Sequence, residues 1–284
     1  MFKRKECSPL EQNNSYSCLD DDLIIDIAKI FNEKMNANID LNQSPKNIHK
    51  HLCEYIKKLT NEKSESCLLD MHKVVNSLPK NKLKRFKNSF RPEKPEEWHK
   101  NFNEWLSTTD IDKVLKQYAV ADPHFYYYGA TPMDFDLKSG NKCVVNGLCK
   151  FDLSEHLSKG IDKIGIVFNT DDHDEPGEHW VAMYVDCVGK NLKYPCIYYF
   201  DSTGDPATPE VEALVERIKN QGGNNIKFTY LENDKEHQKG DSECGMYCLH
   251  FMIYMLEGSD FMKYIKNKKS DEYIQKFRNV FFID

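Results

Sequence analysis

The sequence lacks several features that would narrow its class at once. Its first stretch, "MFKRKECSPLEQNNSYSC", is polar throughout, and no apolar run is long enough to cross a bilayer. This predicts a soluble, cytoplasmic protein without membrane contact. A basic excess is also missing, since the net charge is -6, which argues against a protein that mainly binds nucleic acid. The chain has no internal repeat and no low-complexity tract.

Metal-ligand spacings are scarce although the chain has ten cysteines. The candidates are Cys143 with Cys149, and Cys244 with Cys248 and His250, and neither set contains the C-x-x-C pairs of a structural zinc site. We therefore expect no metal and no cofactor. In a non-secreted chain of 284 residues we expect the cysteines to be free thiols, because intracellular compartments keep thiols reduced.

The N-terminal part of the chain is predicted to be helical. Apolar residues recur at helical period in "DLIIDIAKIFNEKMN" and in "IHKHLCEYIKKL". The following segment, "KNKLKRFKNSFRPEKPEEWHK", has six basic residues between Lys80 and Arg91, two prolines and no sustained apolar stripe. We interpret it as a linker whose basic residues either form a solvated face or contact nucleic acid or an acidic partner. The predicted domains are residues 1–95, a helical arm with a basic linker, and residues 96–284.

The second part of the chain mixes helices and strands. Four segments are rich in β-branched and aromatic residues, as strands are: "IGIVFNT", "HWVAMYVDC", "CIYYFDS" and "NIKFTYLE". The second is apolar on both faces, which predicts a central strand. Helices are predicted in "WLSTTDIDKVLKQYA", capped by Thr108, Thr109 or Asp110, in "TPEVEALVERIKNQGG", capped by Thr208, and in "SDEYIQKFRNVFF".

Cys244 lies where a polar loop meets a nearly continuous apolar run, in "HQKGDSECGMYCLHFMIYML". The residues from Gly245 to Leu256 predict a helix buried at the centre of the domain, with Cys244 at its N-terminus. Unpaired backbone N–H groups and the positive end of the helix dipole favour the nucleophilic thiolate there. Cys248, one turn further into the helix, is predicted to be a core residue.

A thiolate nucleophile needs a base and a group that orients the base. His179 begins the predicted central strand, and Asp201 ends the next strand along the chain, so that neighbouring strands would bring the two side chains together. Asp186, on the same strand as His179, is the weaker alternative. Gln238, on the polar loop before Cys244, is the candidate oxyanion donor.

Each of these residues also has a structural explanation when it is taken alone. Cys244 could be a buried structural cysteine, His179 a satisfied histidine at a strand edge, and Asp201 a turn residue. Their joint order favours catalysis: a histidine at a strand start, an acid at the next strand's end, and a cysteine entering a buried helix.

Three segments carry a resemblance to a known family: "EHWVAMYVD", "YYFDSTGD" and "HQKGDSECGMY". They resemble the motifs of the ubiquitin-like-protein-processing cysteine proteases, which include deSUMOylases and the adenovirus protease, with greatest similarity to the polyprotein-processing proteases of asfarviruses. The resemblance covers about residues 98–284. It implies an α+β, papain-like core, in which a central mixed sheet packs on the helix that starts at the nucleophile, together with a helical N-terminal arm.

The resemblance also implies roles for residues: Cys244 as nucleophile, His179 as base, Asp201 as the third triad member and Gln238 in the oxyanion hole. Glu243 departs from the family, because deSUMOylases usually carry aspartate before the nucleophile. Family members cleave after Gly-Gly in a narrow channel with aromatic walls, a role implied for Trp180 and for Trp105, which could instead anchor the first helix of the domain.

We therefore expect a viral cysteine endopeptidase that cleaves polyproteins at Gly-Gly-Xaa sites in the host cytoplasm or the virion. One alternative is a deSUMOylase or deubiquitinase that acts on host ubiquitin-like conjugates. Another is an acetyltransferase, because some bacterial effectors use a related site to transfer acetyl groups. A binding module that kept the fold without its activity is disfavoured, because all four catalytic roles are filled.

Overall fold

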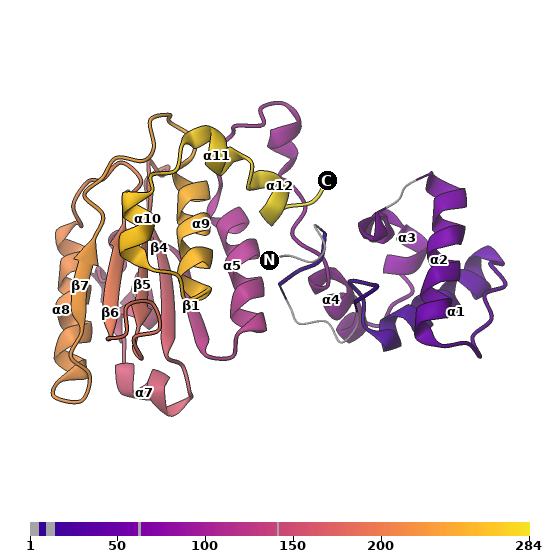
Figure 1. The fold of residues 1–284 in the computed structure, drawn as a ribbon, viewed down its shortest axis with the longest axis horizontal. Helices are drawn as coiled ribbons and strands as arrows, with labels where there is room; N and C mark the ends of the chain where they lie inside the picture. Colours follow the sequence, from indigo (N-terminus) through magenta and orange to yellow (C-terminus); the bar gives the residue numbers. More distant parts are fainter. Residues whose placement is uncertain (1–5, 10–14, 62–63, 141) are drawn as a thin grey trace. The chain divides into compact units, whose positions relative to one another are not determined.

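The chain forms two compact units, each with its own hydrophobic core. The structure is a computed structural model that describes residues 6–9, 15–61, 64–140 and 142–284 (Figure 1). The helical unit comprises Met1–Glu93 with Phe281–Asp284, and the sheet unit comprises Lys94–Val280. The predicted assignment of residues 1–95 to an arm and residues 96–284 to the protease stays a prediction.

The helical unit is built from short helices whose apolar faces pack together. Its described helices are α1 (Asp21–Met35), α2 (Pro45–Thr60), the 3-10 helix η1 (Glu65–Asp70), α3 (His72–Val75) and α4 (Lys80–Asn88). Asp20 caps α1 by accepting from the backbone N–H of Leu23, and Ser44 caps α2. The predicted stripes are buried in the core of this unit, as Phe31 and Leu52 illustrate.

The prediction of a linker between Lys80 and Arg91 was wrong, because much of this segment is the helix α4. Phe86 is completely buried and attaches α4 to the core of the helical unit. Lys82 and Arg85 form ion pairs with Asp26 and Asp20, respectively. These pairs stabilise a helix that has little apolar surface, and they give no support to the predicted nucleic-acid contact.

The prediction that all ten cysteines are free thiols was wrong for four of them. Cys7 is disulfide-bonded to Cys18, and Cys143 to Cys149, with Cα–Cα distances of 5.1 and 6.2 Å. The second pair is one of the sets considered above as metal ligands. Such pairing depends on tertiary proximity, which cysteine spacing alone does not reveal.

A five-stranded mixed sheet organises the sheet unit. Its strands are β1 (Phe125–Pro132), β4 (Lys163–Asn169), β5 (Trp180–Asp186), β6 (Cys196–Phe200) and β7 (Thr229–Glu232), in the order β1-β4-β5-β6-β7. β5 is antiparallel to both of its neighbours, whereas the outer pairs are parallel. All residues of β5 are buried, which confirms its predicted central position. The strands β2 (Lys138–Ser139) and β3 (Lys142–Cys143) have two residues each and together form a small hairpin.

Helices cover both faces of this sheet (Figure 1). α8 (Pro209–Gly222) packs its apolar stripe against residues of β4, β5 and β6. α9 (Cys244–Leu256) contacts β5 and β4, and α5 (Thr108–Ala121) lies beside β1 and α9. The fold is α+β, as predicted. The remaining described helices of this part are η2 (Glu96–His99), α6 (Asn146–Cys149), α7 (Leu153–Ser158), α10 (Phe261–Lys266), α11 (Asp271–Gln275) and α12 (Arg278–Phe281).

Local capping agrees with the prediction for α8 and differs for α5. Thr208 accepts from the backbone N–H of Val211 at the start of α8. α5 is capped by Ser107, not by the three predicted residues, because Ser107 and Asp110 form a reciprocal capping box. Among the described residues, no helix has both the length and the apolar character needed to cross a membrane.

The single helix predicted over "SDEYIQKFRNVFF" is instead two short helices, α11 and α12. Arg278, at the start of α12, is completely buried, and its guanidinium lies 4.2 Å from the ring centroid of Trp98. This tertiary contact outweighs the local helical periodicity on which the prediction depended.

Candidate active site

Cys244 is the first residue of α9. The loop before it is polar, and nearly every residue of the helix is buried, so the helix begins where the chain enters the core. Backbone N–H groups of the first turn have no partner within a helix, and they carry the positive end of its dipole. Cys244 therefore has the predicted position, although the whole residue is only 1% exposed.

His179 and Asp201 are brought together by the antiparallel pairing of β5 and β6. His179 directly precedes β5, and Asp201 directly follows β6. The His179 Nε2 atom lies 2.8 Å from Asp201 Oδ1. The same oxygen accepts from the backbone N–H and the hydroxyl of Thr203, which fixes the carboxylate. Nδ1 is thus the ring nitrogen that remains for Cys244.

The electrostatics of His179 follow from its two partners. Burial lowers the pKa of the imidazole, but hydrogen bonds to Asp201 and Cys244, with the attraction of their negative charges, outweigh burial and raise the pKa to about 10. The ring is therefore held as an imidazolium near neutral pH. We name Cys244, His179 and Asp201 the sheet-unit triad.

Asp186, the alternative orienting group, lies at the opposite end of β5 from His179. Its carboxylate accepts from the backbone N–H groups of Val188, Gly189 and Asn191. These contacts make Asp186 a turn-forming residue. The structure brings Asp201, and not Asp186, to the imidazole.

Gln238 lies on the loop before Cys244, with both ends of its amide held. Its Oε1 atom accepts from the hydroxyl of Ser202 at 2.7 Å, and its Nε2 atom donates to the carbonyl of Gly240 at 2.7 Å. The Ser202 carbonyl also accepts from the backbone N–H groups of His237 and Gln238. Because an amide nitrogen carries two hydrogens, one remains for a further acceptor.

Residues that sequence reasoning missed hold this loop from α11. Asp271 accepts from the backbone N–H groups of Lys239 and Gly240. Gln275 donates to Glu243, the residue before the nucleophile, with an Nε2–Oε1 distance of 2.6 Å. Asp271 and Gln275 are four residues apart on one helix, but nothing in their sequence spacing identifies the loop as their partner.

The two tryptophans predicted as channel walls differ in exposure. Trp180 is 5% exposed, and its indole N–H donates to the carbonyl of Leu106. Trp105 is 39% exposed. A Cβ added to Gly245, next to the nucleophile, would be tightly packed, 3.0 Å from the Leu106 side chain and 3.4 Å from Trp180.

Comparisons of the sequence with known proteins differ in the activity that they name. Residues 137–284 match the model of a family described as YopJ serine/threonine acetyltransferase. A putative thiol protease of Acanthamoeba polyphaga mimivirus is 36% identical over 198 residues, which are 68% of this chain and 60% of that protein. This chain therefore spans less than two thirds of the mimivirus protein.

African swine fever virus supplies a second relative and a solved structure. Its protease, named cysteine protease in one isolate and SUMO-1 cysteine protease in another, is 27% identical over 253 residues, 84% of this chain and 89% of the relative. The crystal structure of the protease from this virus aligns with a TM-score of 0.67 and 22% identity, and covers 98% of this chain and 95% of that one. This likeness in fold extends over nearly the whole chain.

Proposed function

We propose that the chain, which belongs through residues 137–284 to the family described as YopJ serine/threonine acetyltransferase, is an endopeptidase with Cys244 as nucleophile, as the names of its viral relatives favour. The observation that carries the proposal is the convergence of three elements on one imidazole. His179 has a carboxylate on one ring nitrogen and the thiol of a helix-initiating cysteine as its other partner.

The geometry supports a two-step hydrolysis. The Cys244 thiolate attacks the carbonyl carbon of the scissile bond, and the imidazolium of His179 gives its proton to the leaving amine. Water then releases the acyl group from Cys244 while His179 accepts the water's proton. Asp201 keeps the ring in the required orientation and stabilises its charged form.

The oxyanion of the tetrahedral intermediate needs donors that are already in position. The backbone N–H of Cys244, in the first turn of α9, is one candidate. The remaining amide hydrogen of Gln238 is the other, and its orientation is fixed by Ser202 and Gly240.

We propose that the substrate has Gly-Gly before the scissile bond. The nucleophile is 1% exposed, and a Cβ added to its neighbour Gly245 would be tightly packed against Leu106 and Trp180. A segment without side chains can approach such a crowded cysteine, whereas larger residues would collide with its surroundings. Trp105, which is more exposed than Trp180, would supply the accessible aromatic wall.

Viral relatives favour a polyprotein as the substrate and the host cytoplasm or the virion as the place of action. The name SUMO-1 cysteine protease, which one relative carries, favours a ubiquitin-like conjugate as the alternative. These two substrates share the same chemistry, since both proposals require attack by Cys244 on a glycine carbonyl.

The test is cleavage of a peptide with a central Gly-Gly-Ala sequence, compared with the matched Ala-Ala-Ala peptide. We expect the wild-type chain to cleave the Gly-Gly peptide and Cys244→Ala to lose at least about 10⁴-fold in kcat, as enzymes do without their nucleophile. Cys248→Ala, four residues along the same helix, is the control that should keep activity. Equal cleavage by Cys244→Ala would contradict the nucleophile, and equal cleavage of both peptides would contradict Gly-Gly specificity.

The substrate alternatives are separated by trapping the nucleophile. SUMO or ubiquitin with a C-terminal electrophile would label Cys244 if ubiquitin-like proteins are substrates. The family model favours an acetyltransferase as a second candidate function. That function requires an acetyl group on Cys244 after incubation with acetyl-CoA, and mass spectrometry of the intact chain would detect it.

A further inference from the structure

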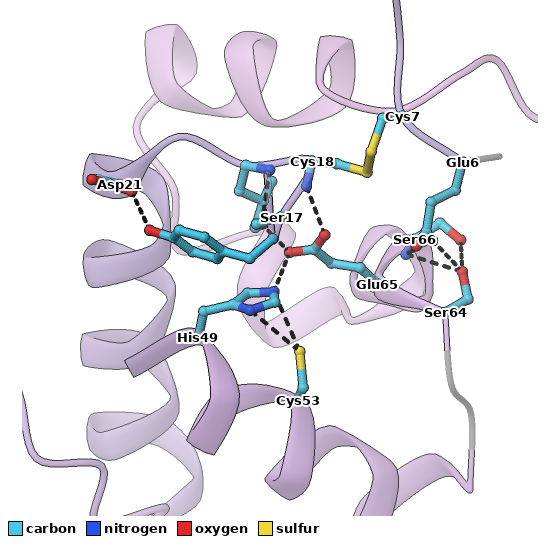
Figure 2. Close-up of polar contacts among 12 residues, drawn as sticks. Glu6, Cys7, Ser17, Cys18, Asp21, His49, Cys53, Ser64, Glu65 and Ser66 are labelled. Atoms are coloured by element: carbon cyan, nitrogen blue, oxygen red, sulfur yellow. Dashed lines mark hydrogen bonds and ion pairs between the residues drawn. A yellow bond between two sulfur atoms is a disulfide. The ribbon is translucent and has the colours of Figure 1, made fainter. Parts of the chain in front are cut away.

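The helical unit contains a second arrangement of cysteine, histidine and carboxylate, which we name the helical-unit triad: Cys53, His49 and Glu65. His49 and Cys53 lie one turn apart on α2, and Glu65 begins η1. The His49 Nε2 atom is 2.9 Å from Glu65 Oε1 and 3.3 Å from the sulfur of Cys53 (Figure 2). The imidazole therefore contacts both the thiol and the carboxylate.

Glu65 has a fixed and buried carboxyl group. Its side chain is 5% exposed, against 12% for His49. Besides His49, it accepts from the hydroxyl of Ser17, and from the backbone N–H of Cys18 at 2.8 Å. Three donors hold this buried carboxylate in position.

Charge on the imidazole follows from these neighbours. Burial lowers the pKa of His49, but the contacts with Cys53 and Glu65 outweigh burial and raise the pKa to about 9. Further titratable groups lie close by: Tyr16, whose ring centroid is 5.5 Å from that of His49 and whose hydroxyl donates to Asp21, and Glu6, which lies near Glu65. The sulfur of Cys53 thus faces an imidazolium at neutral pH.

We propose that Cys53 is a reactive thiol and a site of reversible mixed-disulfide formation with small thiols. The imidazolium of His49 stabilises the thiolate, which is the form that attacks a disulfide. Cys53 is partly exposed and is not disulfide-bonded in the structure. The residue is therefore open in part to a small disulfide.

The exchange step balances without a further reagent when the co-reactant is the disulfide form of a small thiol. The Cys53 thiolate attacks one sulfur of that disulfide, and a bond forms between this sulfur and Cys53. The original sulfur–sulfur bond breaks, and the second thiol leaves as a thiolate that takes a proton from water.

Two other uses of this cluster fit the structure less well. Proteolysis needs an oxyanion donor beside the nucleophile, but Cys53 lies inside α2, where its backbone N–H is bonded within the helix. Glu65 also belongs, with Glu6 and Cys18, to a group whose ligand atoms are close enough to hold a metal ion. The sulfur of Cys18 is bonded to Cys7, however, so it is not available as a thiolate ligand.

The test exposes the full chain at pH 7 to oxidised glutathione and follows the mixed disulfide at each cysteine by peptide mass spectrometry. Cys67 is the matched control, since it is the other partly exposed cysteine that is not disulfide-bonded. We expect Cys53 to react about 10-fold faster than Cys67, because the imidazole of His49 lies 3.3 Å from the attacking sulfur. Equal rates at the two cysteines would overturn the proposal.

Two variants test the source of the reactivity. His49→Gln and Glu65→Gln should each slow the reaction of Cys53 about 5-fold to 10-fold and leave Cys67 unchanged. An unchanged rate at Cys53 in a folded His49→Gln variant would overturn the proposal. If the variants do not fold, the wild-type chain in urea decides, because the ratio of the two rates should fall to about one once the helical-unit triad is lost. A ratio of the Cys53 rate to the Cys67 rate that stays high in urea would also contradict the proposal.

Discussion

Both triads combine a cysteine, a histidine and a carboxylate, which is Asp201 in one and Glu65 in the other, but on different backbones. In the sheet-unit triad, the ends of two strands and the start of a helix converge, so the cysteine has the free N–H groups of a helix N-terminus beside it. In the helical-unit triad, the histidine and cysteine share one helix, and the backbone around the sulfur is already hydrogen-bonded. An imidazolium is enough to make a thiol reactive, whereas catalysis also needs donors for the oxyanion.

The largest expected effect distinguishes the carboxylates of the two triads, Asp201 and Glu65. Asp201→Asn should lower kcat for the Gly-Gly peptide by about 10²-fold to 10⁴-fold, because the imidazole loses the charge that orients and stabilises it. Glu65→Gln is the matched change in the helical-unit triad, and it should alter kcat by less than about 2-fold. Steady-state kinetics on a short peptide measure both. Similar losses of kcat in the two variants would contradict a catalytic role for the sheet-unit triad alone.

The next effect concerns the oxyanion donor that the helical-unit triad lacks. Gln238→Ala should reduce kcat by about 10²-fold to 10³-fold with little change in KM, as expected when a donor acts mainly in the transition state. Gln221→Ala is the control: this glutamine also bridges backbone groups in the sheet unit, those of Leu153 and Phe151, outside the candidate site. A Gln238→Ala enzyme with full kcat would remove Gln238 from the oxyanion hole.

The pH dependence of cleavage follows from the raised pKa of His179. The active form pairs a thiolate with an imidazolium, so kcat/KM should stay high through neutral pH and fall as pH rises through about 10, where the ring loses its proton. In Asp201→Asn the fall should move to lower pH, because the carboxylate no longer supports the charge. An alkaline limb at the same pH in both enzymes would exclude His179 as its source.

A smaller effect on stability is expected from His49. Its pKa is raised from 6.5 to about 9 by folding, so its stabilisation is fully present below about pH 6.5 and is lost as pH rises through about 9. After allowance for solvent screening, the loss should be about 1 to 2 kcal/mol. Hydrogen exchange of α1 and α2 peptides measures it, and His49→Gln should remove this pH dependence. If the stability of the wild-type helical unit does not depend on pH in this range, the ion pair of His49 with Glu65 does not stabilise that unit.

Features with a strong local signal were predictable from the sequence. The four predicted strands are present, α9 starts at Cys244, and Thr208 caps α8. The contact between His179 and Asp201 also follows from local reasoning, since it requires only that two consecutive strands pair in antiparallel fashion. Their catalytic roles stay predictions.

Features that depend on tertiary contacts were missed. β1 is an edge strand with Gly129 inside it and Pro132 at its end, and its register shifts between Tyr127 and Ala130, so it lacks a regular strand pattern. α4 has few apolar residues and is held by ion pairs to α1. The contacts that Asp271 and Gln275 of α11 make with the loop before Cys244 depend on how the chain returns after α9, which no local pattern encodes.

The contact of Ser202 with Gln238 has a consequence for how this enzyme can change over generations. Ser202 follows the acid of the sheet-unit triad directly, and its hydroxyl and carbonyl hold Gln238. Substitutions at positions 202 and 238 should therefore be epistatic, since the effect on activity of a substitution at one position depends on the residue at the other. Loss of the hydroxyl at position 202 would leave the Gln238 amide with the Gly240 carbonyl as its remaining side-chain partner, so under the proposed mechanism a new oxyanion donor would require paired changes rather than a single one.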